Sequence, residues 1–239
     1  MSYDLSEISH QLFELLKRQG ADIDRSELIA EIHDFLAMLY GIKPVFLHGR
    51  GLAPENWIEE VLNLARDLEL EIIEGPFWDA TPYGEFPNWY HEHCRAELKP
   101  YRAWYICQDA ETVDAVQSVN SANGRLSIPK EAKLLGYPEC CVNAHYARAS
   151  HYHRGTLSIL KRLTKGNEKQ MQDLVRGGAH LAPETEKEIK HFDAAFEIHE
   201  PELGSWNMCA SCVRSTNQAS ATLVQQYLNL IEECGLKLG

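Results

Sequence analysis

The hydrophobic positions in the first forty residues recur with the period of an α-helix. One apolar stripe, through Leu12 and Leu15, ends at Gly20. A second, stronger stripe follows Ser26, a residue type that caps helix starts, and ends at Gly41. The pattern therefore predicts two helices at the start of the chain.

Short apolar runs follow these helices. Residues 43–47 and 70–73 have the pattern of strands, and a helix over 54–68 separates them. A third strand is predicted over 101–107, before a short helix over 111–119. Strands joined by a helix commonly run parallel. We therefore expect an α/β (α+β) fold, with a small, mostly parallel sheet and flanking helices in the N-terminal half.

From residue 128 onward the pattern is almost entirely helical. No internal repeat or low-complexity tract interrupts it. We expect an α/β half over residues 1–125 and a helical, cysteine-containing half over residues 126–239, packed as one body. The helices expected in the second half span 129–135, 138–152, 156–163, 167–176, 184–198 and 216–234.

The bulk composition narrows the class of protein. The chain has 239 residues and a net charge of −12, from 35 acidic and 23 basic side chains, which opposes general nucleic-acid binding. No apolar run is long enough to cross a bilayer, and the N-terminal residues lack the basic and apolar regions of a signal peptide. We expect a cytoplasmic protein that binds neither nucleic acid nor membrane.

The charge is distributed unevenly in the second half. Residues 145–176 carry a local balance of +5, and residues 177–204 carry a balance of −5. This pattern favours a basic helix paired with an acidic helix across a solvated seam. The alternative is a site for an anion or an acidic partner on the basic segment.

Four of the seven cysteines fall into two tight groups. Cys140 and Cys141 are adjacent, and Cys209 and Cys212 form a Cys-x-x-Cys pair. In a chain expected to remain in a reducing compartment, such groups indicate a metal site rather than disulfides. Pro138 favours a helix start there, and a helix N-terminus favours the thiolate form of a cysteine.

The adjacent pair leaves the kind of metal open. Neighbouring helix residues point about 100° apart, so Cys140 and Cys141 cannot easily share one small ion. An iron–sulfur cluster held by all four cysteines tolerates this divergence better. If only one of the pair binds, His145, four residues after Cys141, would complete a zinc site with three cysteines.

The same residues carry a family resemblance. The run LLGYPECCV, preceded by YRAWYIC and followed by MCASC, resembles the uncharacterised proteins grouped as the domain-of-unknown-function 483 family. The resemblance covers roughly residues 100–215, and its GYPECC core is its most specific part. It implies that Cys140, Cys141, Cys209 and Cys212 belong to one site, and it brings no established reaction.

Three further residues are candidates for cofactor or substrate binding. Arg50 lies in a Gly-rich turn after a strand, a geometry that can hold an anion on backbone N–H groups. Trp78 and Trp89 belong to an aromatic-rich segment over 77–90 that either packs onto the body or lines a pocket. The chain contains no G-x-S-x-G nucleophile elbow, and this absence disfavours a serine hydrolase.

Two functions are consistent with these features. The first is an iron–sulfur enzyme that acts on a small molecule bound between the two halves, with no reaction class indicated. The second is a zinc-clamped, non-enzymatic binding protein or subunit with a protein partner. A closed set of four ligands favours a structural role, whereas an open position favours catalysis.

Overall fold

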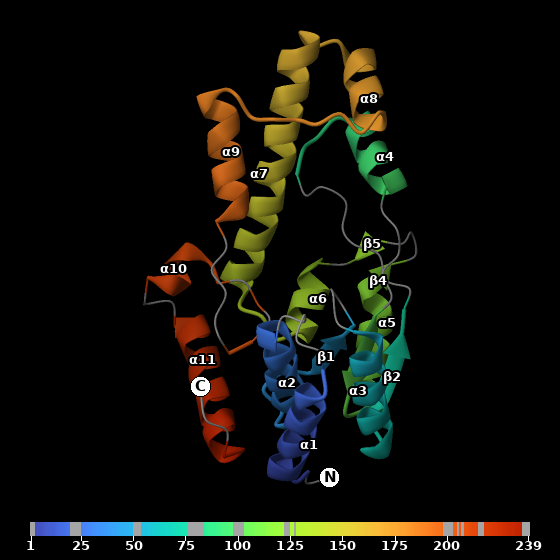
Figure 1. Ribbon diagram of the computed structural model, residues 1–239, viewed down its shortest axis with the longest axis vertical. Helices are drawn as coiled ribbons and strands as arrows, with labels where there is room; N and C mark the ends of the chain where they lie inside the picture. Colours follow the sequence, from blue (N-terminus) through green and yellow to red (C-terminus); the bar gives the residue numbers. More distant parts are fainter. Residues whose placement is uncertain are drawn as a thin grey trace.

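We describe a computed structural model of the chain (Figure 1). For residues 120–121, 125–126, 128–129 and 218–219 only the backbone is described. The described residues are 3–19, 25–49, 54–75, 84–97, 103–121, 125–126, 128–197, 203–204, 206, 208–214 and 218–235.

Three helices in the N-terminal half agree with the sequence-based expectation. α1 (Leu5–Lys17) and α2 (Arg25–Leu39) pack against each other, and α3 (Glu55–Asp67) lies against α1. The Asp4 carboxylate accepts a hydrogen bond from the Glu7 N–H and so caps α1. These helices cover the sheet with their apolar faces.

The prediction of a mostly parallel sheet was wrong. The three-stranded sheet contains β1 (Val45–His48), β2 (Glu71–Glu74) and β3 (Trp104–Cys107) in the order β1-β3-β2. Both strand pairs are antiparallel, and Cys107 in β3 lies opposite Val45 on one side and Glu71 on the other. The mixed α+β class holds, because helices predominate around this small sheet.

The error has a clear physical origin. β1 and β2 do run in the same direction, as a strand-helix-strand unit requires, but they do not pair with each other. β3 enters between them, and all four of its residues are buried. β2 is left at an edge with its two terminal glutamates exposed, which disfavours further strand pairing.

Short elements connect the sheet to the second half of the chain. α4 (Asn88–Glu97) precedes β3, and α5 (Ala110–Val119) follows it. A two-stranded ribbon of β4 (Asn120–Ser121) and β5 (Arg125–Leu126) then leads into α6 (Ile128–Leu134).

α7 (Glu139–Thr164) is one helix where the sequence pattern predicted two. The expected break fell near Gly155, a poor helix former. A β-carbon at Gly155 would lie 2.8 Å from the Cε2 atom of Phe192 in α9 (Glu186–Phe196). The glycine therefore allows a close helix–helix approach in the middle of α7 rather than ending it.

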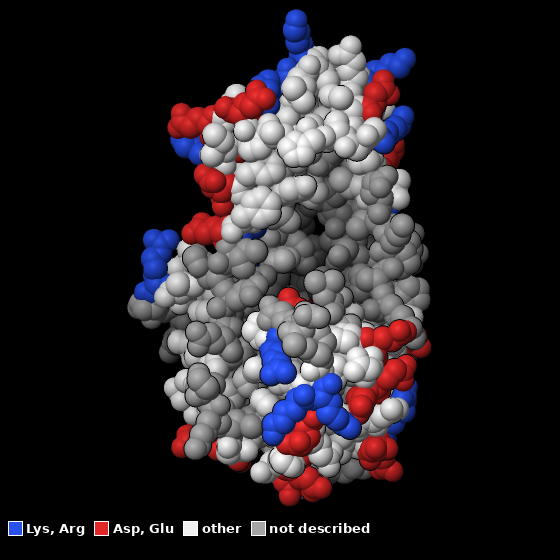
Figure 2. All heavy atoms as spheres, viewed as in Figure 1, with Lys and Arg blue, Asp and Glu red and all other residues white. Residues whose placement is uncertain are grey.

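At one end of this helix pair the ion pairs agree with the predicted pairing of basic with acidic residues. Arg162 of α7 forms ion pairs with Glu184 and with the buried Glu188, at 2.6 and 3.0 Å. Figure 2 shows acidic and basic side chains interspersed over this end of the molecule, where α7, α8 (Glu168–Arg176) and α9 lie.

The remaining helices return the chain to the body. α7 extends away from the sheet, and α9 lies beside it (Figure 1). By contrast, α10 (Ala210–Val213) and α11 (Gln218–Glu233) lie near the N-terminal end of α7. The largest apolar cluster joins Phe35 and Trp104 of the first half to Cys141, Cys212 and Tyr227 of the second. The cysteines thus belong to the main core of the protein.

Among the described residues, no helix has both the length and the apolarity needed to cross a membrane.

Candidate metal centre

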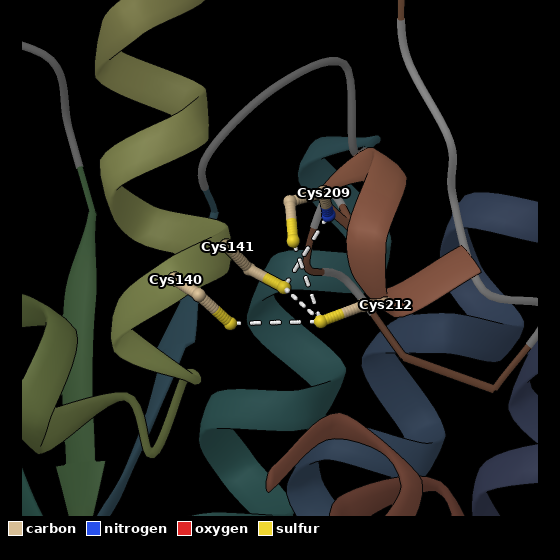
Figure 3. A group of neighbouring side chains, drawn as sticks. All are labelled: Cys140, Cys141, Cys209 and Cys212. Carbon is tan, nitrogen blue, oxygen red and sulfur yellow. Dashed lines mark hydrogen bonds between the residues drawn. The ribbon is translucent and has the colours of Figure 1, made fainter. Parts of the chain in front are cut away.

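Four cysteine thiols meet where the N-terminal end of α7 faces α10 (Figure 3). The Sγ atom of Cys212 lies 3.3 Å from that of Cys209, 3.5 Å from that of Cys140 and 3.6 Å from that of Cys141. All four sulfurs lie within 4.8 Å of one another. No other group of three or more histidines, cysteines and acids with this geometry occurs in the described part of the chain. The four thiols can hold a metal ion.

The Gly-Tyr-Pro segment before α7 sets the direction of the first cysteine pair. Gly136 has a φ of +69°, and a β-carbon there would lie 3.1 Å from the Lys43 Cβ atom. The sequence predicted Pro138 as the first residue of the helix. In the structure Pro138 is the N-cap of α7, and the helix begins one residue later, at Glu139. Cys140 and Cys141 therefore occupy the first turn of the helix.

The second cysteine pair lies on a single helical turn. Cys209 is the N-cap of α10, and its carbonyl oxygen accepts a hydrogen bond from the Cys212 N–H at 2.9 Å. This turn brings the two sulfurs of the Cys-x-x-Cys pair together, as the spacing predicts.

Hydrogen bonds and helix ends surround the sulfurs with partial positive charge. The Cys209 N–H donates to the Cys141 Sγ atom at 3.4 Å, and the Ser220 hydroxyl of α11 lies 3.4 Å from the same sulfur. The Ser211 hydroxyl lies 3.4 Å from the Cys209 Sγ atom. The N-terminal turns of α7 and α11 thus both lie at the cluster, where their dipoles favour negative charge.

Burial and hydrogen bonding separate the pKa values of these thiols. Burial raises the pKa of Cys140 and, more strongly, that of Cys212. Burial opposes ionisation of Cys209 too, but hydrogen bonds from the Ser211 hydroxyl and the Cys212 N–H lower its pKa to about 6. Cys209 therefore ionises before Cys140 and Cys212, and a bound cation is needed to hold several thiolates together.

The adjacent cysteines reach the same place despite their divergence along the helix. The sequence-based expectation was that Cys140 and Cys141 cannot easily share one small ion. Both side chains nevertheless point toward Cys212 (Figure 3), at 3.5 and 3.6 Å. Cys212 lies between their two directions, so the angle between neighbouring helix positions does not separate their sulfurs.

The other predicted site residues lie apart from the thiols or outside the described residues. His145 is exposed with its ring against Tyr146, and it is not a member of the thiol group. Trp89 is half-buried on α4 and packs in a separate apolar cluster with Tyr90. The roles assigned to these residues stay predictions. Arg50 and Trp78 lie outside the described residues.

A buried ion pair between α2 and the loop that follows it was missed by the sequence analysis. Lys43 and Asp34 are both 2% exposed at their side chains, with Nζ and Oδ2 2.9 Å apart. Burial disfavours the ammonium form, but the Asp34 carboxylate outweighs that effect and raises the pKa of Lys43. The Tyr227 hydroxyl of α11 donates a hydrogen bond to the same carboxylate. The one available signal was a lysine at the edge of an apolar run, directly before Pro44.

Aromatic rings connect this ion pair to both cysteine segments. The Lys43 ammonium lies 5.0 Å from the centre of the Tyr137 ring, three residues before Cys140. The Tyr137 and Tyr227 rings both lie against Trp206, three residues before Cys209. Through these rings, the buried ion pair is connected to the segments that lead into the two cysteine pairs.

Comparisons with known proteins give no assignment. No protein-family model, curated protein or solved structure matches this chain.

Proposed function

We propose that the chain is a zinc protein in which Cys140, Cys141, Cys209 and Cys212 hold one ion. The ion clamps the start of α7 to α10 and α11, and the protein acts as a non-enzymatic binding protein or partner subunit. The observation that carries the proposal is the close, mutual spacing of all four sulfurs. All seven cysteines are free thiols, which supports a reducing, cytoplasmic location.

The spacing suits a single tetrahedral ion. Zn–S bonds of about 2.3 Å at tetrahedral angles put ligand sulfurs about 3.8 Å apart. Three of the observed separations lie between 3.3 and 3.6 Å, and every separation is below 4.8 Å. Small outward shifts of the sulfurs would accommodate zinc.

An iron–sulfur cluster fits this spacing less well. In a cluster the four thiolates are divided between two or more iron atoms with inorganic sulfide between them, so not all four sulfurs lie this close together. Housing one would require the first turn of α7 to move away from α10. We therefore place the iron–sulfur enzyme second to the zinc clamp.

The number of ligands supports a structural role. Four cysteines close a tetrahedral site, whereas a catalytic zinc keeps one position for water or substrate. The clamp connects residues far apart in the chain, since Cys141 and Cys212 are 71 positions apart. Zinc with four thiolates leaves two net negative charges. The Cys209 N–H, the Ser220 hydroxyl and two helix N-termini are placed to compensate them.

The sequence resemblance is consistent with this proposal. We infer from LLGYPECCV and MCASC that the chain is related to the domain-of-unknown-function 483 family. That relation assigns the same four cysteines to one site and adds no reaction. The clamp would then be a shared feature, and the first hundred residues would carry whatever is particular to this protein.

Metal analysis of the protein purified anaerobically without added metal tests the proposal. We expect one equivalent of zinc and no absorption band in the visible range. Cys212→Ser should lose the zinc, whereas Cys234→Ala, which removes a buried thiol outside the cluster, should retain it. Iron with sulfide and a broad visible absorption would establish a cluster instead. Iron without sulfide would establish a mononuclear iron site, and full metal-free stability would overturn the clamp.

A further inference from the structure

Two histidines meet across the seam between α7 and α9, at some distance along α7 from the thiol cluster. The Nδ1 atoms of His151 and His191 lie 3.1 Å apart, and both side chains are half-buried. Gly155 permits this contact, because a β-carbon there would lie 3.2 Å from the His191 Cβ atom. At this distance one Nδ1 atom donates and the other accepts, so the pair holds at least one neutral ring.

The charges that act on His191 are positive. Burial lowers the pKa of His191, and the positive charges of His151, Lys187 and Arg154 lower it further. In the described part of the chain, neither Lys187 nor Arg154 has an ion-pair partner. The arrangement is unusual in a chain with a net charge of −12.

Two other basic residues of the same helices have acidic partners. Arg162 has two glutamate partners, and Lys190 pairs with Glu186 at 2.8 Å. Arg154 and Lys187, beside the histidine pair, have no such partner among the described residues. The general pairing of a basic helix with an acidic one does not account for these two charges.

Helical spacing places these four side chains together. His151 and Arg154 are three residues apart on α7, and Lys187 and His191 are four residues apart on α9, so each pair shares a helix face. The exposed aromatic rings of Tyr152 and Phe196 contact each other at 6.3 Å and belong to the neighbouring face. One side of the seam is thus basic and the other aromatic.

The local charge decides which kind of ligand the pair can take. Two imidazole nitrogens 3.1 Å apart also suit a metal ion, whose nitrogen ligands lie about 3.3 Å apart in a tetrahedral site. A cation would be repelled by Arg154 and Lys187, and among the described residues no carboxylate joins the two histidines in a group of three metal ligands. A bound anion would be attracted by the same two groups, and it would stabilise a second proton on the histidine pair.

We propose that His151, Arg154, Lys187 and His191 form a binding site for a phosphate-class oxyanion. The ligand is either free phosphate or the phosphate group of a larger molecule. The site shares no residue with the thiol cluster, and the proposal does not rest on the zinc clamp. Arg154 and Lys187 supply fixed charge, and the histidine pair supplies N–H donors once it is protonated.

Calorimetric titration and thermal melting with inorganic phosphate test the site, with sodium chloride at equal ionic strength as the reference. We expect saturable binding and a rise in melting temperature with phosphate that chloride does not produce. Glycerol 3-phosphate, tested alongside, separates the sources: binding equal to or tighter than that of phosphate indicates a phosphate ester as the ligand, and weaker binding indicates the free ion. Identical melting in phosphate and chloride would overturn the proposal.

Charge-removing variants locate the effect. Arg154→Gln removes an exposed side chain and should weaken phosphate binding roughly tenfold, the usual loss for one charge-assisted hydrogen bond. Lys169→Gln, an exposed lysine on α8, is the matched control and should bind as the parent does. His191→Gln should also weaken binding, and its melting curve in chloride reports whether α9 remains docked. Equal affinity of all three variants would overturn the assignment to this seam.

Discussion

The Sγ atoms of Cys141 and Cys212 lie 3.6 Å apart, although 71 positions separate the residues in the chain. Cys141 is 2% exposed and lies in the main apolar core together with Cys212. The contact closes a long loop that contains α7 from Cys141 onward and all of α8 and α9. A metal ion at this point would constrain the chain much as a disulfide does, because it fixes the two ends of that loop.

The four cysteines should differ in their importance for metal affinity. Cys141 accepts a hydrogen bond from the Cys209 N–H and lies against the Ser220 hydroxyl, whereas Cys140 is half-buried. We expect Cys141→Ser to weaken zinc binding more than Cys140→Ser, by a further factor of about 10 to 100, as for loss of supporting contacts around a metal ligand. Competition with a chromophoric chelator measures both affinities. Equal losses would show that the surrounding hydrogen bonds contribute nothing.

Removal of the metal should loosen one part of the protein. Chelation is expected to increase amide hydrogen exchange in α10, the first turn of α11 and the first turn of α7, because the proposed ion would link α7 to α10 and Ser220 of α11 contacts one of its ligands. The α4 and α8 contact lies in a separate apolar cluster and should keep its protection. Uniform loss of protection throughout the chain would mean that the ion supports global folding rather than this corner.

The sequence predicted the site better than it predicted the sheet. Cysteine spacing depends on local geometry, and one turn is enough to bring Cys209 and Cys212 together. Strand order depends on contacts distant in sequence, and nothing near β1 or β2 indicates that β3 will enter between them. The same limitation hid the role of Gly155, which is understandable only with Phe192 beside it. It also hid the Asp34–Lys43 pair, whose partners lie in segments that look apolar.

Removal of one partner of the buried Asp34–Lys43 pair should destabilise the folded protein. Lys43→Met leaves the Asp34 carboxylate buried without its counter-charge, and we expect a loss of about 3–5 kcal/mol in unfolding free energy. Asp34→Asn in the Lys43→Met background should recover part of this loss, because the uncompensated charge is gone. Urea unfolding of the single and double variants checks the coupling. A double variant with the summed losses of both single variants would contradict it.

His153 should make the protein sensitive to mild acid. Burial, assisted by the nearby charge of His91, lowers the pKa of His153 from 6.5 to about 4. Its Nδ1 atom lies 3.0 Å from the Tyr90 hydroxyl, and Tyr90 is 3% exposed. Between these two pH values the unfolded chain binds a proton at this residue and the folded chain does not. Stability is therefore full above pH 6.5 and falls as the pH decreases toward 4.

Replacement of the imidazole separates this effect from other acid-sensitive groups. His153→Gln should flatten the decrease in melting temperature between pH 6.5 and 4.5, whereas the control His180→Gln changes an exposed residue and should follow the parent. Burial also lowers the pKa of His33, and thiolate ligands release metal in acid, so some dependence on pH will remain in every variant. The comparison is thus made between variants at each pH. Parallel curves for His153→Gln and the parent would show that His153 is protonated at its ordinary pKa in the folded protein.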